Sequence, residues 1–191
     1  MKVAGIVLAG GQSRRFGEHK ALALYNGASF LDHSIEALSC HTDFITIVSH
    51  PDFIESIKDK YQANVILDLE EYKGQGPLAG ILSAMKSNLA DWYLVVPCDT
   101  PLLKEQMIGT LKDSIEKEMQ AIVPVSDEKL QPLIAAYSRS VKPVIEKLLK
   151  EDKRSMRDLL NEVKTFYLEE KTFDESAFLN INDKKSLDQL G

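Results

Sequence analysis

The sequence predicts an α/β fold in which a mostly parallel sheet carries helices on both faces. Along the 191 residues, short apolar runs of strand length alternate with stretches of helical periodicity, which is the pattern of parallel strands joined by helices. Residues 92–96 are apolar without interruption, as expected of a central strand that is buried on both faces. A chain of this length is expected to form a single domain over 1–191, with no linker.

The composition excludes several other classes of protein. An apolar fraction of 44% is enough to build a core, so a wholly disordered chain is excluded. The net charge of −6 argues against general binding of nucleic acid or of anionic membranes. Cys40 and Cys98 show neither metal-ligand spacing nor a disulfide framework. Because no signal peptide follows Met1 and no apolar stretch reaches about 20 residues, the sequence indicates a cytoplasmic protein without a membrane span.

The first half of the chain alternates strand and helix. The first strand is expected at 3–8, and a glycine-rich loop follows at 8–17. The β-branched run at 44–48 predicts the second strand. Pro77 suits the first turn of a helix, because the N–H that proline lacks would have no intrahelical partner there. The other elements expected in this half are a helix at 30–39, a helix at 52–61, a strand at 65–67, a polar loop at 69–76 and a helix from Pro77 to about residue 87.

The second half continues the alternation less regularly. Pro124 lies within the apolar run 121–125, so this strand is expected to be marginal or bent. Residues 178–182 read FLNIN and predict a strand before a terminal helix at 183–190. The other elements expected here are a helix at 104–119, a strand at 130–137, a helix at 141–150, a short helix beginning near 154–160 and an edge strand at 165–168.

The loop after the first strand reads LAGGQSRRFG at 8–17, and Lys20 follows it. Its three glycines allow the backbone to approach a ligand closely and to adopt positive φ angles. Arg14, Arg15 and Lys20 add three cations within a few residues, a combination that suits a polyphosphate. The spacing matches neither Gly-x-Gly-x-x-Gly nor the P-loop, because Lys20 comes three residues after Gly17. A glycine turn with two solvated arginines is the alternative interpretation.

Asp99 follows the apolar strand at 92–96 and lies between Pro97 and Pro101, which stop both strand and helix. It is therefore expected at the carboxyl end of a central strand, where open α/β sheets bind their ligands. One or two carboxylates with substrate phosphates are the usual ligands of Mg²⁺, so Asp99 is a candidate metal ligand. A turn aspartate that bonds its own backbone is the alternative. The neighbouring Cys98 is interpreted as a small buried residue.

Two of these motifs resemble those of one known family. The string LAGGxSxRFGxxK at 8–20 looks like the signature loop of nucleotidyltransferases that move a nucleoside monophosphate from an NTP onto an acceptor phosphate. With Gly11 as the second glycine of the pair Gly10-Gly11, the loop resembles that of the molybdenum cofactor guanylyltransferases. The related cytidylyltransferases usually have Ala-Ala-Gly at this place. The run PCDTP at 97–101 resembles the metal-binding motif of the same family.

The resemblance assigns roles to particular residues. It implies a catalytic set of Arg15, Lys20 and Asp99, with Mg²⁺ bound at Asp99. The residues that it places at the nucleotide are Leu8, Ala9, Gly10, Gly11, Lys20, Asp68, Gly76 and Asp99. The residues that it places at the acceptor, in the C-terminal half, are Gln131, Arg154, Asn180 and Asn182. Phe16, where the family usually has Met, and His19, where it often has Asp, are mild departures.

Some of these assignments also have a physical basis. Asp68 follows the strand at 65–67, and its carboxylate can accept two N–H bonds from a guanine edge, although an ordinary strand-end aspartate is an equal alternative. Gly76 precedes a helix N-terminus, whose free N–H groups favour an anion or a polar base, and tight helix packing is the alternative. Asn180 and Asn182 would share one face of a strand. Which of the two approaches the metal stays open.

As a whole, the resemblance implies a three-layer, doubly wound, Rossmann-like nucleotidyltransferase fold. It also implies transfer of GMP from GTP to molybdopterin or to its molybdenum-loaded form, giving the guanine dinucleotide cofactor and pyrophosphate. The partners would be these two substrates and, transiently, proteins of cofactor synthesis or molybdoenzyme maturation. The alternatives are a related CTP-dependent or sugar-phosphate nucleotidyltransferase and a nucleotide-binding adaptor that lacks chemistry.

Overall fold

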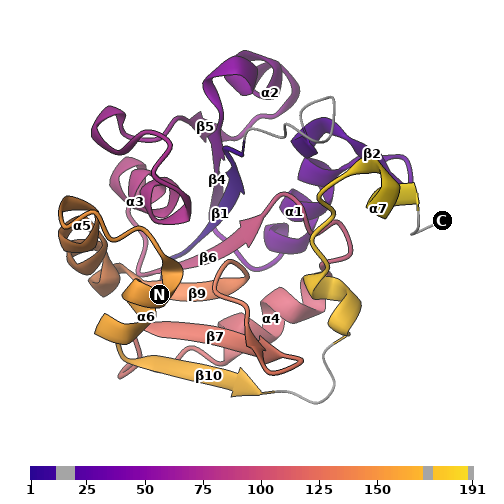
Figure 1. Cartoon of the computed structure of the whole chain (residues 1–191). Helices are drawn as coiled ribbons and strands as arrows, with labels where there is room; N and C mark the ends of the chain where they lie inside the picture. Colours follow the sequence, from indigo (N-terminus) through magenta and orange to yellow (C-terminus); the bar gives the residue numbers. More distant parts are fainter. Residues whose placement is uncertain (12–19, 170–173, 189–191) are drawn as a thin grey trace.

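The computed structural model describes residues 1–11, 20–169 and 174–188. Its main sheet is 8-stranded, with the order β10-β7-β9-β6-β1-β4-β5 and with β8 paired to β7 (Figure 1). The strands of this sheet are β1 Val3–Ala9, β4 Phe44–Ser49, β5 Asn64–Ile66, β6 Trp92–Pro97, β7 Ala121–Ser126, β8 Lys129–Leu130, β9 Ala135–Ser138 and β10 Thr165–Glu169. The α-helices are α1 Phe30–Ser39, α2 Ile54–Lys60, α3 Pro77–Ser87, α4 Glu105–Asp113, α5 Lys142–Lys150, α6 Met156–Glu162 and α7 Lys184–Asp188.

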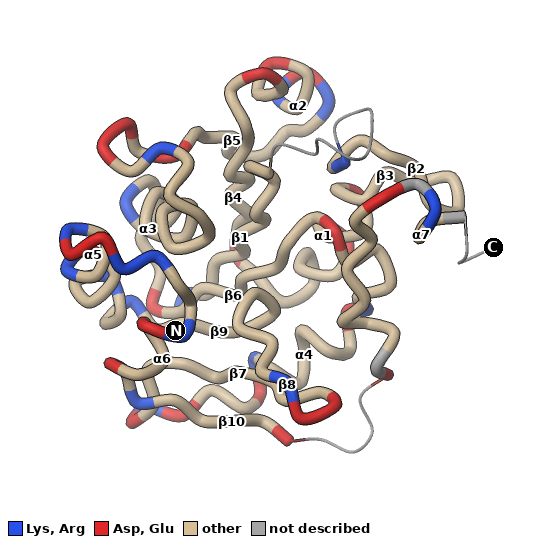
Figure 2. The backbone as a smooth tube through the Cα atoms, viewed as in Figure 1, with Lys and Arg blue, Asp and Glu red and all other residues tan. Residues whose placement is uncertain are grey.

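Helices cover both faces of the main sheet, and the side chains of β6 show why. Tyr93 and Val95 pack into a core formed with α3, α5 and α6. Trp92, Leu94 and Val96 pack into a second core, formed with α1, α2 and α4. Because successive residues of a strand point to opposite faces, a fully apolar strand must be covered on both. Strands β1, β4, β6, β7 and β9 accordingly contain no Asp, Glu, Lys or Arg (Figure 2). The predicted three-layer α/β fold is confirmed.

The sheet is doubly wound about β1. This strand pairs in parallel with β4 on one side and with β6 on the other, and β4 pairs in parallel with β5. The chain winds outward from β1 to β5 and then crosses through α3 to β6, on the opposite side of β1. The order therefore reverses between β1 and β6, and such a switch point is where open α/β sheets bind ligands. Strands β9 and β8 run antiparallel to their neighbours, so the sheet is mostly parallel.

Two predicted strands of the second half need correction. The strand expected at 130–137 is wrong: a turn at Pro132 separates β8 from β9, and Gln131 donates its N–H to the carbonyl of Pro124. The strand expected to be marginal at 121–125 instead pairs with β9, β10 and β8. Pro124 lies between the residues that pair with β9 and those that pair with β8, so its missing N–H interrupts neither ladder.

The helix expected at 104–119 is too long. Helix α4 ends at Asp113, because the hydroxyl of Ser114 donates to the carbonyl of Thr110 and the chain continues in turns that still bring Ile115 to the core. Side-chain bonds of this kind compete with the helical pattern. Within the described ranges, no helix is long and apolar enough to cross a membrane.

Two short elements near the switch point also differ from the prediction. The strand expected at 178–182 does not form in the described chain; Ile181 donates its N–H to the carbonyl of Asp99 instead of to a strand. A hairpin that the prediction lacks, β2 Leu24–Tyr25 with β3 Ala28–Ser29, precedes α1. Its turn residues Asn26 and Gly27 both have positive φ, the conformation that an Asn-Gly pair adopts most readily in a two-residue hairpin.

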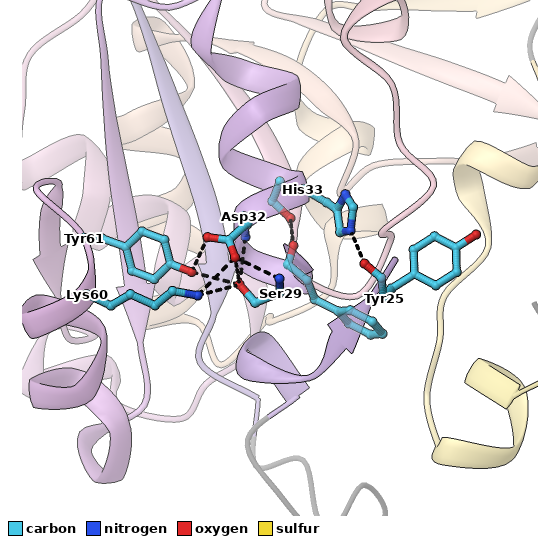
Figure 3. Close-up of polar contacts among 8 residues, drawn as sticks. Tyr25, Ser29, Asp32, His33, Lys60 and Tyr61 are labelled. Carbon is cyan, nitrogen blue, oxygen red and sulfur yellow. Dashed lines mark hydrogen bonds and ion pairs between the residues drawn. The ribbon is translucent and has the colours of Figure 1, made fainter. Parts of the chain in front are cut away.

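The start of α1 is tied to the end of α2 by one carboxylate (Figure 3). Ser29 and Asp32 form a capping box, in which each side chain bonds the other's backbone N–H. The hydroxyl of Tyr61 donates to Asp32 Oδ1 at 2.7 Å, and Lys60 Nζ lies 3.0 Å from Oδ2. Partial burial acts to raise the pKa of Asp32, but the hydrogen bonds from Ser29, Tyr61 and Lys60 together hold that pKa far below its ordinary range. This cluster fixes the N-terminus of α1 against the C-terminal end of α2.

Candidate active site

A cavity of about 820 Å³ lies at the carboxyl ends of β1, β4, β5 and β6. Residues within two positions of the end of each strand line the cavity: Gly10 and Gly11 after β1, His50 after β4, Asp68 after β5 and Asp99 after β6. The cavity therefore spans the switch point of the sheet. Because the strands themselves carry no charge in this region, its charged side chains come from the loops.

Lys20 lies at the centre of the polar contacts in this cavity. Its ammonium Nζ lies 2.8 Å from Oδ2 of Asp99 and 2.8 Å from Oδ1 of Asn182. The residue is only 9% exposed, because Lys20–Leu22 forms a 3₁₀ turn that carries the side chain inward. A short contact between an ammonium and a carboxylate is a charge-assisted hydrogen bond, stronger than a neutral one. The site thus joins the first loop, the central strand and the C-terminal segment.

Asp99 presents its second carboxylate oxygen differently. Within the described part of the chain, Oδ1 of Asp99 is buried and has no hydrogen-bond partner. A buried carboxylate oxygen without a partner is costly and calls for a donor or a cation. The described ranges contain no group of three His, Cys, Asp or Glu residues that could hold a metal ion. Asp99 therefore fits a hard cation that takes its other ligands from phosphates and water, as Mg²⁺ commonly does.

Helix α3 approaches the cavity closely because two glycines allow it. Gly76 precedes the helix with φ of 83°, a conformation that L residues rarely adopt. A Cβ at Gly80 would lie 2.9 Å from Cδ2 of Leu8 and 3.6 Å from Oδ1 of Asp68. The helix N-terminus, with Pro77 in its first turn, thereby lines the cavity. Its backbone N–H groups offer a partial positive charge to a polar ligand.

Asp68 lines the same side of the cavity. Its Oδ2 accepts the N–H of Gly74 at 3.2 Å. Burial raises the pKa of Asp68 above its ordinary value, while the bond from Gly74 and the charge of His50 act in the opposite direction. The carboxylate therefore combines partial desolvation with an open edge toward the cavity, which is the environment in which a hydrogen bond to a ligand gains most.

The structure brings together most of the residues that the sequence pointed to. The predicted site residues that line the cavity are Leu8, Ala9, Gly10, Gly11, Lys20, Asp68, Gly76, Asp99 and Asn182. Gln131, Arg154 and Asn180 are described but are not among its lining residues. Arg154 nevertheless lies near the rim, because its carbonyl oxygen is 4.0 Å from the position of a Cβ on Gly76. Arg15 falls outside the described ranges.

Comparison with known proteins decides which family the fold and cavity belong to. The sequence profile of the "MobA-like NTP transferase domain" matches residues 5–166. The chain belongs to this family. Relatives from Bacillus cereus and Bacillus cytotoxicus, each named "Probable molybdenum cofactor guanylyltransferase", are 42% identical over 186 residues and 40% identical over 190 residues. These alignments cover 96% and 98% of this chain and 93% and 96% of the two relatives. The family resemblance seen in the motifs, and with it the expected class of enzyme, a nucleotidyltransferase, is confirmed.

Solved structures of MobA-like and related proteins agree with the fold. The molybdopterin-guanine dinucleotide biosynthesis protein A of Archaeoglobus fulgidus superposes with a TM-score of 0.81 at 28% identity, covering 99% of this chain and 96% of that one. The 4-diphosphocytidyl-2C-methyl-D-erythritol synthase of Anaerococcus prevotii superposes with a TM-score of 0.75 at 14% identity, covering 98% and 95%. The second likeness concerns the fold alone.

Several cavity residues of this MobA-like chain were not predicted. They are Val48, Ser49, His50, Pro51, Leu67, Glu70, Lys73, Gly74 and Leu133. All but Leu133 lie at the end of β4 or in the loops that follow β4 and β5, so the rule that ligands bind beyond the carboxyl ends of parallel strands points to them. That rule predicted Asp99, whereas the sequence at the end of the second strand, Val48 to His50, lacks the asparagine that some family members have there, and no contact was predicted from it. Leu133 has no such signal, because its place depends on the turn that separates β8 from β9.

Proposed function

We propose that the chain transfers GMP from GTP to the terminal phosphate of molybdopterin or of its molybdenum-loaded form, giving molybdopterin guanine dinucleotide and pyrophosphate. The observation that carries this proposal is the contact between Lys20 and Asp99 beside Gly10 and Gly11, at the switch point of a nucleotidyltransferase fold. The guanine base and the molybdopterin acceptor rest on the names of relatives that are about 42% identical. Handover from cytoplasmic proteins of cofactor synthesis is part of the same proposal.

The acceptor makes few demands on side-chain chemistry. A phosphate monoester has a second pKa near 6, so the attacking oxygen is already largely ionised at neutral pH. The chain must instead bring two anions together in line and neutralise the charge that develops around the α-phosphorus. Lys20 would meet the phosphates as a compact charge, and Gly10 and Gly11 let the backbone approach them. Arg15 stays the proposed second cation, able to bind two oxygens at once.

Asp99 is the proposed Mg²⁺ ligand. Lys20 already bonds Oδ2, so Oδ1 is the oxygen that this carboxylate would offer to the ion. When bound, Mg²⁺ would neutralise phosphate charge and stabilise the leaving pyrophosphate. Asn182 accepts a hydrogen bond from the ammonium of Lys20. It would therefore hold the side chain of Lys20 in place rather than bind Mg²⁺.

The opposite end of the cavity is the proposed guanine site. Asp68 would accept hydrogen bonds from the N–H groups of the guanine edge, a pattern that cytosine and uracil do not offer. The N-terminus of α3 at Gly76 and Gly80 would face the polar groups of the nucleotide. Beyond the rim, Gln131, Arg154 and Asn180 are proposed to contact the acceptor. Because these three residues do not line the cavity proposed for the nucleotide, their substitution should weaken binding of the acceptor more than binding of GTP.

A nucleotide panel tests this proposal directly. The thermal midpoint of the chain would be measured with Mg²⁺ and equal concentrations of GTP, CTP, ATP and UTP, with EDTA as the control for the metal. A ligand at about a hundred times its dissociation constant stabilises by about 2.7 kcal/mol, which shifts the midpoint measurably. A shift selective for GTP and weakened by EDTA is the expected result. A shift selective for CTP would replace the substrate, and no shift with any nucleotide would favour a role without nucleotide chemistry.

A further inference from the structure

The C-terminal segment returns to the cavity through a small apolar cluster of its own. Ile181 is 3% exposed and packs with Ala23 and Phe30, and Tyr25 and Leu187 lie against them. This cluster is separate from the two cores of the main sheet. Figure 1 shows the segment that leads to α7 lying beside the β2 hairpin and the start of α1. A side chain from the far end of the sequence therefore covers the stretch that follows Lys20.

The backbone of Ile181 also holds the loop of Asp99. Its N–H donates to the carbonyl oxygen of Asp99 at 2.9 Å. Asn182, the next residue, accepts from Nζ of Lys20 at 2.8 Å. Two neighbouring residues thus bond the two members of the ion pair, one through the backbone and one through a side chain.

The floor of the apolar cluster is connected to Lys20 as well. Ala23 donates its N–H to the carbonyl of Lys20 at 3.1 Å, and Phe30 donates its N–H to the carbonyl of Ala23 at 2.9 Å. Burial of Ile181 against Ala23 and Phe30 therefore fixes the C-terminal segment to the same backbone that carries the ammonium. Ala177 and Phe178 attach the same segment to the second core, three and more residues before Ile181. The side chain of Ile181 is therefore the buried apolar anchor that stands directly beside Asn182.

We infer that Ile181 is a positioning residue: its side chain anchors the C-terminal segment so that Asn182 and the Ile181 N–H hold Lys20 and Asp99 in their catalytic arrangement. This inference rests on the proposed function. Small displacements of reacting groups lower turnover steeply while leaving remote binding contacts intact. The guanine end of the cavity, at Asp68 and Gly76, has no hydrogen bond to this segment within the described residues. The anchor should therefore act on turnover more than on nucleotide affinity.

The kinetic test compares Ile181→Ala, Asn182→Ala and the double variant, each assayed for guanylyl transfer. Both single variants should lower kcat about tenfold while the KM for GTP stays within about twofold. The double variant should have about the same kcat as Ile181→Ala alone, because loss of the anchor already releases the contact between Asn182 and Lys20. Leu179→Ala is the matched control, since Leu179 lies in the same segment but is 49% exposed. Its kcat should not change, and Ile181→Val should recover most of the loss.

A second readout does not require transfer activity. Lys20 is shielded by its contacts with Asp99 and Asn182, so acylation of its amine should be slow. In Ile181→Ala and Asn182→Ala, the acylation rate of Lys20, followed by peptide mass spectrometry, should rise about tenfold, whereas that of the exposed Lys129 should not change. If the wild-type chain shows no transfer but the labelling of Lys20 still rises in the two variants, the anchor is supported and the proposed function is rejected. Unchanged labelling and unchanged kcat in a folded Ile181→Ala variant would overturn the inference, as would a loss of thermal stability with normal kcat per folded molecule.

Discussion

The ammonium of Lys20 lies 2.8 Å from Oδ2 of Asp99, although the two residues are 79 positions apart in the sequence. Both side chains are largely withdrawn from solvent, with exposures of 11% and 24%. Removing one member of such a pair leaves the other charge without its partner, which costs more than the pair itself contributes. The pair is therefore weak evidence for stability, and it places a cation and a carboxylate at one point of the cavity, as the proposed chemistry requires.

Replacing Asp99 should remove catalysis but not the fold. Asp99→Asn keeps the shape of the side chain and removes its charge, so turnover is expected to fall about a hundredfold or more. Asp91→Asn is the matched control, because Asp91 precedes the same strand at its opposite end and bonds the N–H of Lys2. Circular dichroism and the thermal midpoint would show that both variants fold. Near-normal turnover in Asp99→Asn would reject the metal assignment.

Asp68 should determine the choice of base. In Asp68→Asn the amide can accept from guanine but also presents a donor to it, so kcat/KM for GTP is expected to fall about tenfold to a hundredfold relative to CTP. Because burial raises the pKa of Asp68, the ionised form that accepts from guanine is lost at a higher pH than for an ordinary aspartate. GTP affinity of the wild-type chain should thus weaken as the pH falls toward that pKa, and the variant should lack this dependence. Equal pH profiles for both chains would exclude this role of Asp68.

The Asp32 cluster should contribute to stability in a pH-dependent way. Asp32→Asn is expected to lower the free energy of unfolding by about 1 kcal/mol at pH 7, a modest value because the carboxylate is 34% exposed. The folded-state pKa lies far below the ordinary value of 3.8, so the contribution is complete above about pH 5 and is lost progressively below pH 4. Urea unfolding at several pH values measures the difference between the two chains. Asp59→Asn, on the exposed side of α2, is the control. If the difference in unfolding free energy between the wild-type chain and Asp32→Asn stays the same in acid, the account is contradicted.

The two cysteines should differ sharply in reactivity. Burial, with the nearby charge of Asp99, raises the pKa of Cys98 to about 12, whereas Cys40 is exposed. At pH 8 the thiolate fraction of Cys98 is then on the order of one in ten thousand, and only thiolates react readily with iodoacetamide. Mass spectrometry should find one alkylated site in the wild-type chain and none in Cys40→Ser. Comparable labelling of both cysteines would show that Cys98 is not a buried inert thiol.

The fold was predictable from the sequence because its main features are local. A fully apolar run such as 92–96 requires cover on both faces, and the alternation of strands with helices then requires parallel pairing. The errors arose where tertiary contacts overrule the local pattern. The pattern of residues 130–137 does not reveal the turn at Pro132. In the predicted strand 178–182, the N–H of Ile181 bonds the carbonyl of Asp99 instead of a neighbouring strand.

The site was predictable where a residue comes within two positions of the end of a strand, as Asp68 and Asp99 do. The position of Asn182 required the structure, because the segment that carries it is held by Ile181 in a cluster formed with residues more than a hundred positions away. Gln131, Arg154 and Asn180 were predicted to bind the acceptor from motif resemblance alone. They do not line the cavity, and their roles stay predictions.

The most direct test of the central claim is transfer of label from α-phosphate-labelled nucleotides to molybdopterin in the presence of Mg²⁺. With GTP, the account predicts a labelled dinucleotide and an equal amount of pyrophosphate, both dependent on molybdopterin and both lost in Asp99→Asn. Preferential labelling from CTP, or no labelled dinucleotide from any nucleotide with the folded chain, would contradict the proposed function.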